Sequence, residues 1–209
     1  MFENFKVTSK KLCATFKITV FLPNDYDKNA NIYNSLFIVS GSNPFTNPQY
    51  KLESYLASKN LLGFAIYPSI DVSKNKLLYN SFDSKYNYAL LYEDFIINEL
   101  KPLLTEKYRI NKGFNGNFIL GIKDTAILAY SLAYHYTNNF EKLLAHELSL
   151  NNDKLFMSDL MSKFDPNISF YFSTTNNSLS KVIEERLRLF GAVDIYLGNQ
   201  DITSLIERL

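Results

Sequence analysis

Short apolar runs alternate along this chain with amphipathic segments, and each run ends at turn-forming residues. Thr15–Leu22 alternates β-forming and polar residues and stops at Pro23, which predicts a strand ending in a turn. The continuous apolar runs Ser35–Val39 and Leu61–Tyr67 are typical of strands that are buried on both faces. Leu52–Lys59, between these runs, has helical spacing. A helix between two buried strands favours parallel pairing.

The second half of the chain continues this alternation. Tyr88–Tyr108 predicts a long amphipathic helix that Pro102 should kink or restart, and the polar, aromatic-rich stretch Ile70–Asn87 before it predicts an ordered surface loop. The other predicted elements are strands at Asn117–Leu120, Leu143–His146, Ser169–Phe172 and Val193–Leu197, and helices at Asp124–Tyr136, Ser180–Phe190 and Ile202–Leu209. We therefore predict a single α/β domain over residues 1–209, a three-layer sandwich whose mostly parallel sheet carries helices on both faces.

Composition supports one folded domain and excludes some partners. A chain of 209 residues is long enough for one hydrophobic core, and 46% of its residues are hydrophobic, including 17 Phe and 15 Tyr. The net charge of +1 gives no long-range field that would collect nucleic acid or an anionic membrane. We therefore expect neither of these to be a partner.

Cysteine content and the N-terminal pattern both favour the cytoplasm. Cys13 is the only cysteine, so no disulfide can form within the chain, and its apolar neighbourhood predicts a small buried side chain. Lysines interrupt the N-terminal stretch where a signal peptide would need an apolar run. The longest apolar run, Leu61–Tyr67, is far below the ~18 residues that a membrane helix needs.

Several local sequences resemble the esterase D and enterochelin-esterase group of the α/β-hydrolases, and the resemblance extends through nearly the whole chain. Phe21-Leu22-Pro23 with Tyr26 resembles the end of an early family strand, and Leu36–Gly41 resembles the next one. Tyr92–Pro102, followed by Tyr108-Arg109, is similar to the helix that precedes the nucleophile strand and is the most specific match. The resemblance implies an α/β-hydrolase-like fold and a Ser, His and acid triad.

The nucleophile position of this family is occupied here by a lysine. Phe118–Ala126 matches the strand and the G-x-S-x-G-G turn, with Lys123 in place of the serine. Only Gly121 remains of the family's glycines, because Thr125 and Ala126 replace the second and third. A β-branched residue at that crowded place predicts a relaxed turn in place of the strained corner.

The other two catalytic positions are also changed. Gly198–Leu205 resembles the segment that carries the general-base histidine, and Gln200 stands in its place, although an amide cannot act as a base near neutral pH. The acid should fall within Ser173–Asn177, where no acidic residue occurs and Asn176 aligns best. Because a triad works as a unit, the loss of three roles predicts an inactive site.

Five further residues are expected to line a vestigial pocket, and an ordinary structural role is an alternative interpretation for them. These residues are Gly41, Ser42, Gly121, Asp124 and His146. His146 ends a strand at the carboxyl edge of the sheet, where a functional side chain could lie, but a hydrogen-bonded structural histidine is the favoured interpretation. His135 lies about three helical turns after Lys123, roughly 18 Å away, and is expected to be out of reach. Lys123 beside Asp124 permits a nucleophilic amine, although an ion-paired lysine on a turn is favoured.

Three functional hypotheses remain open. The leading one is a catalytically inactive esterase-like protein. It would not be an enzyme but would bind a protein partner or small ligand, act as a scaffold or form a homo-oligomer. The alternative is an active, diverged carboxylesterase with a rearranged site that uses Lys123, His146 or Ser42. The third is a small-molecule binder at the old site. Metal-ligand spacing, a phosphate-binding loop and a dinucleotide fingerprint are all missing from the sequence, so no cofactor is implied.

Overall fold

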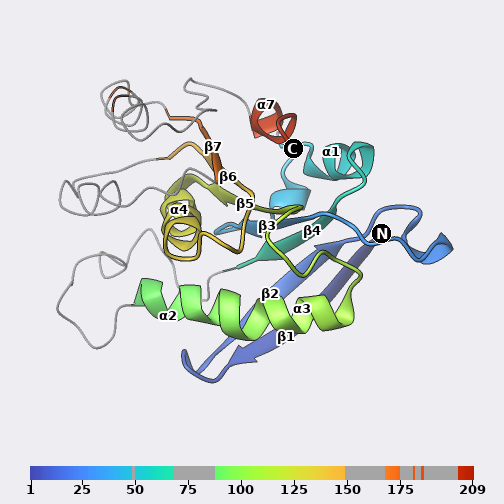
Figure 1. Cartoon of the computed structure of the whole chain (residues 1–209), viewed down its shortest axis with the longest axis horizontal. Helices are drawn as coiled ribbons and strands as arrows, with labels where there is room; N and C mark the ends of the chain where they lie inside the picture. Colours follow the sequence, from blue (N-terminus) through green and yellow to red (C-terminus); the bar gives the residue numbers. More distant parts are fainter. Residues whose placement is uncertain (49, 68–87, 149–167, 175–180, 182–184, 186–201) are drawn as a thin grey trace.

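The computed structural model describes residues 1–48, 50–67, 88–148, 168–174, 181, 185 and 202–209. These residues form one central sheet and the helices around it (Figure 1). Its strands are β1 (Phe2–Ser9), β2 (Ala14–Phe21), β3 (Ser35–Val39), β4 (Leu62–Ile66), β5 (Asn117–Ile122), β6 (Lys142–His146) and β7 (Ser169–Phe172). They lie in the order β1-β2-β4-β3-β5-β6-β7. The β1–β2 and β2–β4 pairs are antiparallel, and all pairs from β4 to β7 are parallel. This arrangement confirms the predicted mostly parallel sheet.

The helices cover both faces of the sheet, as predicted. One face packs against α2 (Tyr88–Asp94), the π-helical segment η4 (Phe95–Leu100), α3 (Lys101–Lys107) and α4 (Ala126–His135), and the other against α1 (Leu52–Ser58) and α7 (Ile202–Ile206). Short 3-10 turns form at Tyr26–Lys28 (η1), Pro44–Thr46 (η2) and Lys123–Thr125 (η5). Along β3, Phe37 and Val39 belong to the first core and Leu36 and Ile38 to the second, as alternation along a strand requires. The sheet is therefore the middle of three layers.

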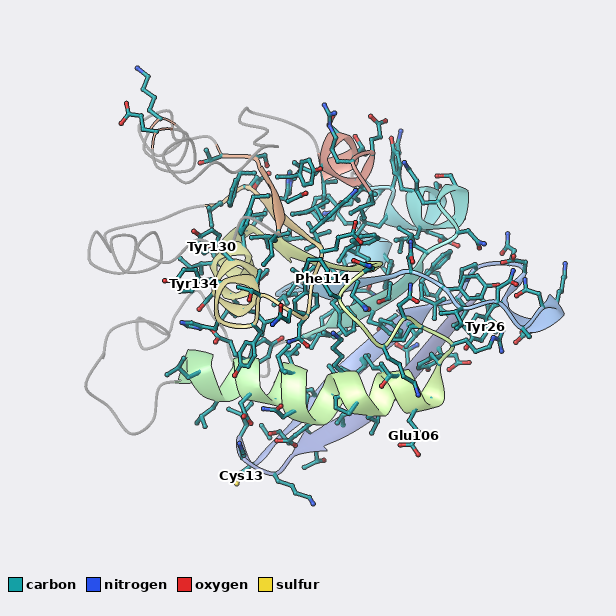
Figure 2. All side chains as sticks on the ribbon, viewed as in Figure 1. Cys13, Tyr26, Glu106, Phe114, Tyr130 and Tyr134 are labelled. Carbon is teal, nitrogen blue, oxygen red and sulfur yellow. The ribbon has the colours of Figure 1, made fainter. Side chains whose placement is uncertain are left out.

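The first hairpin corrects two expectations from the sequence. β1 was not predicted, and it pairs along its full length with β2. Cys13, expected to be buried, is exposed in the turn between these strands with a φ of 49°, and Figure 2 shows it at the outer end of the hairpin. The apolar alternation that suggested burial belongs to the strands on either side, and the turn that joins them faces solvent.

The predicted helix over Tyr88–Tyr108 is present and runs without a break to Lys107, changing from π-type to α-helical turns at Lys101. Residues of η4 form wider π-type turns, and the N–H of Lys101 donates to the carbonyl of Ile96 five residues earlier. Pro102 then falls in the first turn of α3, where its missing N–H is tolerated.

The described helices include none with the length and apolar content needed to cross a bilayer.

Three predictions fall on residues outside the described ranges. These are the loop Ile70–Asn87, the strand Val193–Leu197 and, except for Lys181 and Glu185, the helix Ser180–Phe190. The remaining predicted elements agree with the observed ones to within a few residues at their ends. The described residues therefore include β3, β5 and β6 in full.

Candidate functional site

A sharp corner joins β5 to α4 at Lys123, the residue that the sequence analysis predicts for the nucleophile position. Lys123 has a φ of 57°, which places this non-glycine residue in the left-handed region at a cost of about 1 kcal/mol. The expectation of a relaxed turn is therefore wrong. The strained corner is kept although its side chain is a lysine.

Thr125 and Gly121 together explain how this corner forms. The Thr125 hydroxyl oxygen lies 2.6 Å from the Val39 carbonyl and 2.8 Å from the Ile122 carbonyl, and it is buried. The hydroxyl thus ties the first turn after the corner to both β3 and β5. At Gly121 a Cβ atom would lie 2.5 Å from the Ala126 Cα, so helix and strand approach as closely as backbones can. Thr125, which argued against a strained corner in the sequence, is therefore one of the two residues that stabilise it.

Replacing Thr125 by valine is expected to lower the free energy of unfolding by about 2 kcal/mol. Valine keeps the branched shape but leaves the buried carbonyls of Val39 and Ile122 without this hydroxyl donor. Urea unfolding of the wild type, Thr125→Val and the matched control Thr125→Ser measures the effect. The serine variant keeps the hydroxyl and should retain most of the stability, and equal losses in both variants would refute the proposed role of the hydroxyl.

An ion pair crosses the carboxyl edge of the sheet next to the corner. Because Ile122 of β5 is paired with His146 of β6, the residues that follow them, Lys123 and Glu147, face each other. Lys123 Nζ lies 3.7 Å from Glu147 Oε2, and the two side chains are 58% and 44% exposed. Glu147 also has a left-handed backbone, with a φ of 53°. An exposed pair of this kind contributes about 0–1 kcal/mol, so stability alone does not account for two strained residues here.

His146 is buried next to this ion pair, and each of its ring nitrogens has a polar neighbour. Its Nδ1 lies 3.0 Å from Ser173 Oγ, and its Nε2 lies 3.4 Å from Glu147 Oε1. Ser173 Oγ also accepts the Glu147 N–H at 2.9 Å, so this one hydroxyl contacts both His146 and the backbone of Glu147. The Tyr50 ring packs edge-on against His146, and burial raises the pKa of its phenol. His146 is thus buried and has a hydrogen-bond partner in Ser173.

The remaining predicted pocket residues end neighbouring strands. Gly41 and Ser42 follow β3, where the Ser42 N–H donates to the Ser40 hydroxyl at 3.4 Å, and both residues are exposed. Asp124 is exposed in the first turn after the corner. The parallel register places Val39 of β3 beside Gly121 of β5, so the structure brings these segments to the same edge as Lys123.

His135 is tied to a different part of the molecule. Its Nδ1 lies 2.7 Å from Glu93 Oε2, and the Ser131 hydroxyl also donates to the Glu93 carboxylate, which is almost fully buried. In a catalytic triad the serine donates to the histidine, and the carboxylate contacts only the other ring nitrogen. Here both groups bind the same carboxylate, so the cluster joins α4 to α2 and does not form a triad.

Two predicted positions, Asn176 and Gln200, lie outside the described residues. Two other residues at the carboxyl edge, Glu147 and Tyr50, were not singled out from the sequence. Glu147 directly follows a strand that ends in a histidine, and its place at a carboxyl strand end was a usable signal. Tyr50 offered no such signal, because it reaches the edge from the loop before α1.

The described part of the chain contains no group of three or more His, Cys, Asp or Glu side chains arranged to hold a metal ion.

Comparison with known sequences gives a family match over most of the chain. Residues 9–163 match the family described as "Putative esterase". No curated protein sequence matches the chain.

Solved structures resemble the fold at low sequence identity. A ferulic acid esterase has a TM-score of 0.74 at 16% identity, covering 99% of this chain and 96% of its own. An IroE-like serine hydrolase from Shewanella oneidensis has a TM-score of 0.76 at 15% identity, covering 100% of this chain and 79% of its own. The S-formylglutathione hydrolase FrmB from Staphylococcus aureus has a TM-score of 0.72 at 13% identity, covering 100% and 94%. At these identities the likeness shows the fold.

Proposed function

This chain belongs to the putative esterase family, and we propose that it is a pseudoenzyme of that family. In this proposal it keeps the esterase-like fold and the corner after β5 but performs no ester hydrolysis. Its role is to bind a small ligand or protein partner, to act as a scaffold or to form a homo-oligomer, in the cytoplasm. Lys123, Asn176 and Gln200 take the nucleophile, acid and base positions.

The observation that carries this proposal is Lys123 at a retained left-handed corner. A serine there would be an exposed hydroxyl held for attack, with the N–H of the following residue available to an oxyanion. The lysine side chain instead extends into solvent and pairs with Glu147. Asp124 adds a carboxylate to the residue whose N–H would face the oxyanion, and a second negative charge there disfavours the transition state of ester hydrolysis.

The alternative, a rearranged hydrolase, has one supporting feature in the Ser173 and His146 pair. Ser173 is 2% exposed and His146 is 4% exposed, so an ester carbonyl cannot reach the hydroxyl in this arrangement. Its oxygen is also engaged by the Glu147 N–H. These contacts favour the pseudoenzyme over a site built on His146.

Labelling with a fluorophosphonate probe tests the proposal, because such probes react with activated serine nucleophiles. We expect no more labelling of the native protein than of the heat-unfolded protein. Variants Ser42→Ala and Ser173→Ala serve to locate any signal. Labelling of the native protein that disappears in one of these variants would reject the pseudoenzyme and identify the serine of an active site.

A further inference from the structure

β1 is the outermost strand at one side of the sheet, and its outer edge carries backbone groups that bond to no other described strand. The Leu22 N–H donates to the Met1 carbonyl at 2.9 Å, and the Met1 amino group donates to the Leu22 carbonyl at 3.0 Å. Because such bonds alternate along an antiparallel pair in regular register, the odd-numbered residues of β1 bond to β2. The N–H and carbonyl groups that point outward are therefore those of Phe2, Asn4, Lys6 and Thr8.

The two faces of β1 offer different surroundings to an added strand. On one face Glu3, Phe5 and Val7 are half-buried, and the two apolar side chains pack against the first core. On the other face the side chains are exposed, and Lys6 lies directly opposite Lys17 of β2. Side chains alternate between the faces of any strand. An added strand would thus have one side next to apolar residues and the other next to two lysines.

The Lys6 and Lys17 pair is not neutralised by the described residues. Like charges directly opposite each other destabilise a sheet, and neither ammonium makes an ion pair with a described carboxylate. Residues 1–22 contain four lysines and one glutamate, although the whole chain has a net charge of only +1. Charge complementarity therefore favours a partner strand with acidic side chains on this face.

Protection of the edge does not explain both lysines. A lysine on an edge strand commonly prevents unwanted pairing, and Lys6 is placed to do so. Lys17, however, belongs to β2, whose two edges are already paired with β1 and β4. Its position opposite Lys6 adds repulsion without protecting an edge. A second copy of β1 would bring two more lysines to the same face, so self-pairing is disfavoured while an acidic strand is not.

We infer that the outer edge of β1 binds an extended acidic segment of a protein partner, which adds a strand to the sheet. The outward backbone groups of β1 supply the hydrogen bonds, and alternate acidic side chains of the partner face Lys6 and Lys17. The inference deepens the proposed binding role by naming a surface and a class of partner. Binding of a peptide and hydrolysis of an ester are measured separately, so either idea can fail alone.

Fluorescence anisotropy of the full chain with a labelled peptide tests the inference. The peptide is as long as β1 and alternates glutamate with valine. We expect saturable binding of this peptide and no measurable binding of a control with lysine in place of glutamate. A strand bonds to each neighbour through alternate residues, so N-methylation of every second nitrogen should abolish binding on one side of the peptide and be tolerated on the other.

The variant Lys17→Glu tests the charge without changing the edge. Glutamate opposite Lys6 is an attractive cross-strand pair, so the variant should fold at least as stably as the wild type. Its affinity for the glutamate peptide should fall by at least about fivefold, because an attraction becomes a repulsion. The control Lys112→Glu makes the same charge change at an exposed residue before β5 and should alter the affinity by less than about twofold.

Equal affinities for the glutamate and lysine peptides would overturn the inference, as would no binding of the glutamate peptide. Equal binding of the two N-methylated peptides would also overturn it, because the attraction would then be charge alone, without an added strand. Equal losses of affinity in Lys17→Glu and Lys112→Glu would show that the face with the lysine pair has no special part in binding.

Discussion

Replacing Gly121 by alanine is expected to lower the free energy of unfolding by about 3 kcal/mol. The added Cβ would lie 2.5 Å from Ala126 Cα, 2.7 Å from Ala129 Cβ and 2.9 Å from the Thr125 carbonyl oxygen. Two of these three neighbours are backbone atoms, which cannot move aside as the end of a side chain can. Helix α4 must therefore shift away from β5, which loosens the packing that holds Lys123 at the corner.

Urea unfolding of Gly121→Ala and of the control Gly113→Ala measures this effect. A Cβ at Gly113 would have no atom within 4 Å, so that variant should change the stability little. Because both variants lose the freedom of a glycine backbone, the difference between their free energies of unfolding measures the crowding at Gly121. A Gly121→Ala variant as stable as the control would mean that α4 does not need its close approach to β5.

Replacing Lys101 by methionine is expected to remove a pH dependence of stability of about 3 kcal/mol. Lys101 is 6% exposed, and burial lowers the pKa of its ammonium from 10.5 to about 8. Its Nζ donates to the carbonyl and side-chain oxygens of Asn139 at 2.9 and 3.1 Å, but no carboxylate of the described residues pairs with it. The folded state therefore holds this charge less well than the unfolded state does.

The direction of the effect follows from proton binding. Between pH 8 and 10.5 the unfolded chain keeps the Lys101 proton while the folded chain has lost it, so stability from this group rises with pH. The full penalty applies below pH 8. Unfolding free energies of the wild type, Lys101→Met and the exposed control Lys112→Met, measured from pH 7 to 10.5, test this. The wild type and control should gain about 3 kcal/mol relative to Lys101→Met, and three parallel curves would contradict the prediction.

Much of the parallel sheet could be predicted from local pattern. Ser35–Val39 and Leu61–Tyr67 are continuous apolar runs because β3 and β4 are covered on both faces, and this burial is visible as a sequence signal. β1 was missed because it lies at the edge of the sheet, where seven of its eight residues are exposed or half-buried and apolar residues are few. The turn at Cys13 was hidden for the opposite reason, since its immediate neighbours, Leu12 and Ala14, are apolar.

The corner shows why the site was harder to predict than the fold. A β-branched Thr125 argued for a relaxed turn because local sterics were the only available evidence. The hydrogen bond from its hydroxyl to Val39, 86 residues away, reverses that argument, and such a contact depends on the pairing of β3 with β5. Glu147 reaches Lys123 through the pairing of β5 with β6 in the same way. Long-range register decides both features, and a local pattern does not contain it.

Steady-state hydrolysis of p-nitrophenyl acetate tests the central claim most directly, with Lys123→Ala and His146→Gln measured beside the wild type. The wild type is expected to hydrolyse the ester no faster than either variant or an equal amount of serum albumin. Sustained wild-type turnover that one of these substitutions abolishes would contradict the account, because it would show a working active site at the carboxyl edge of the sheet.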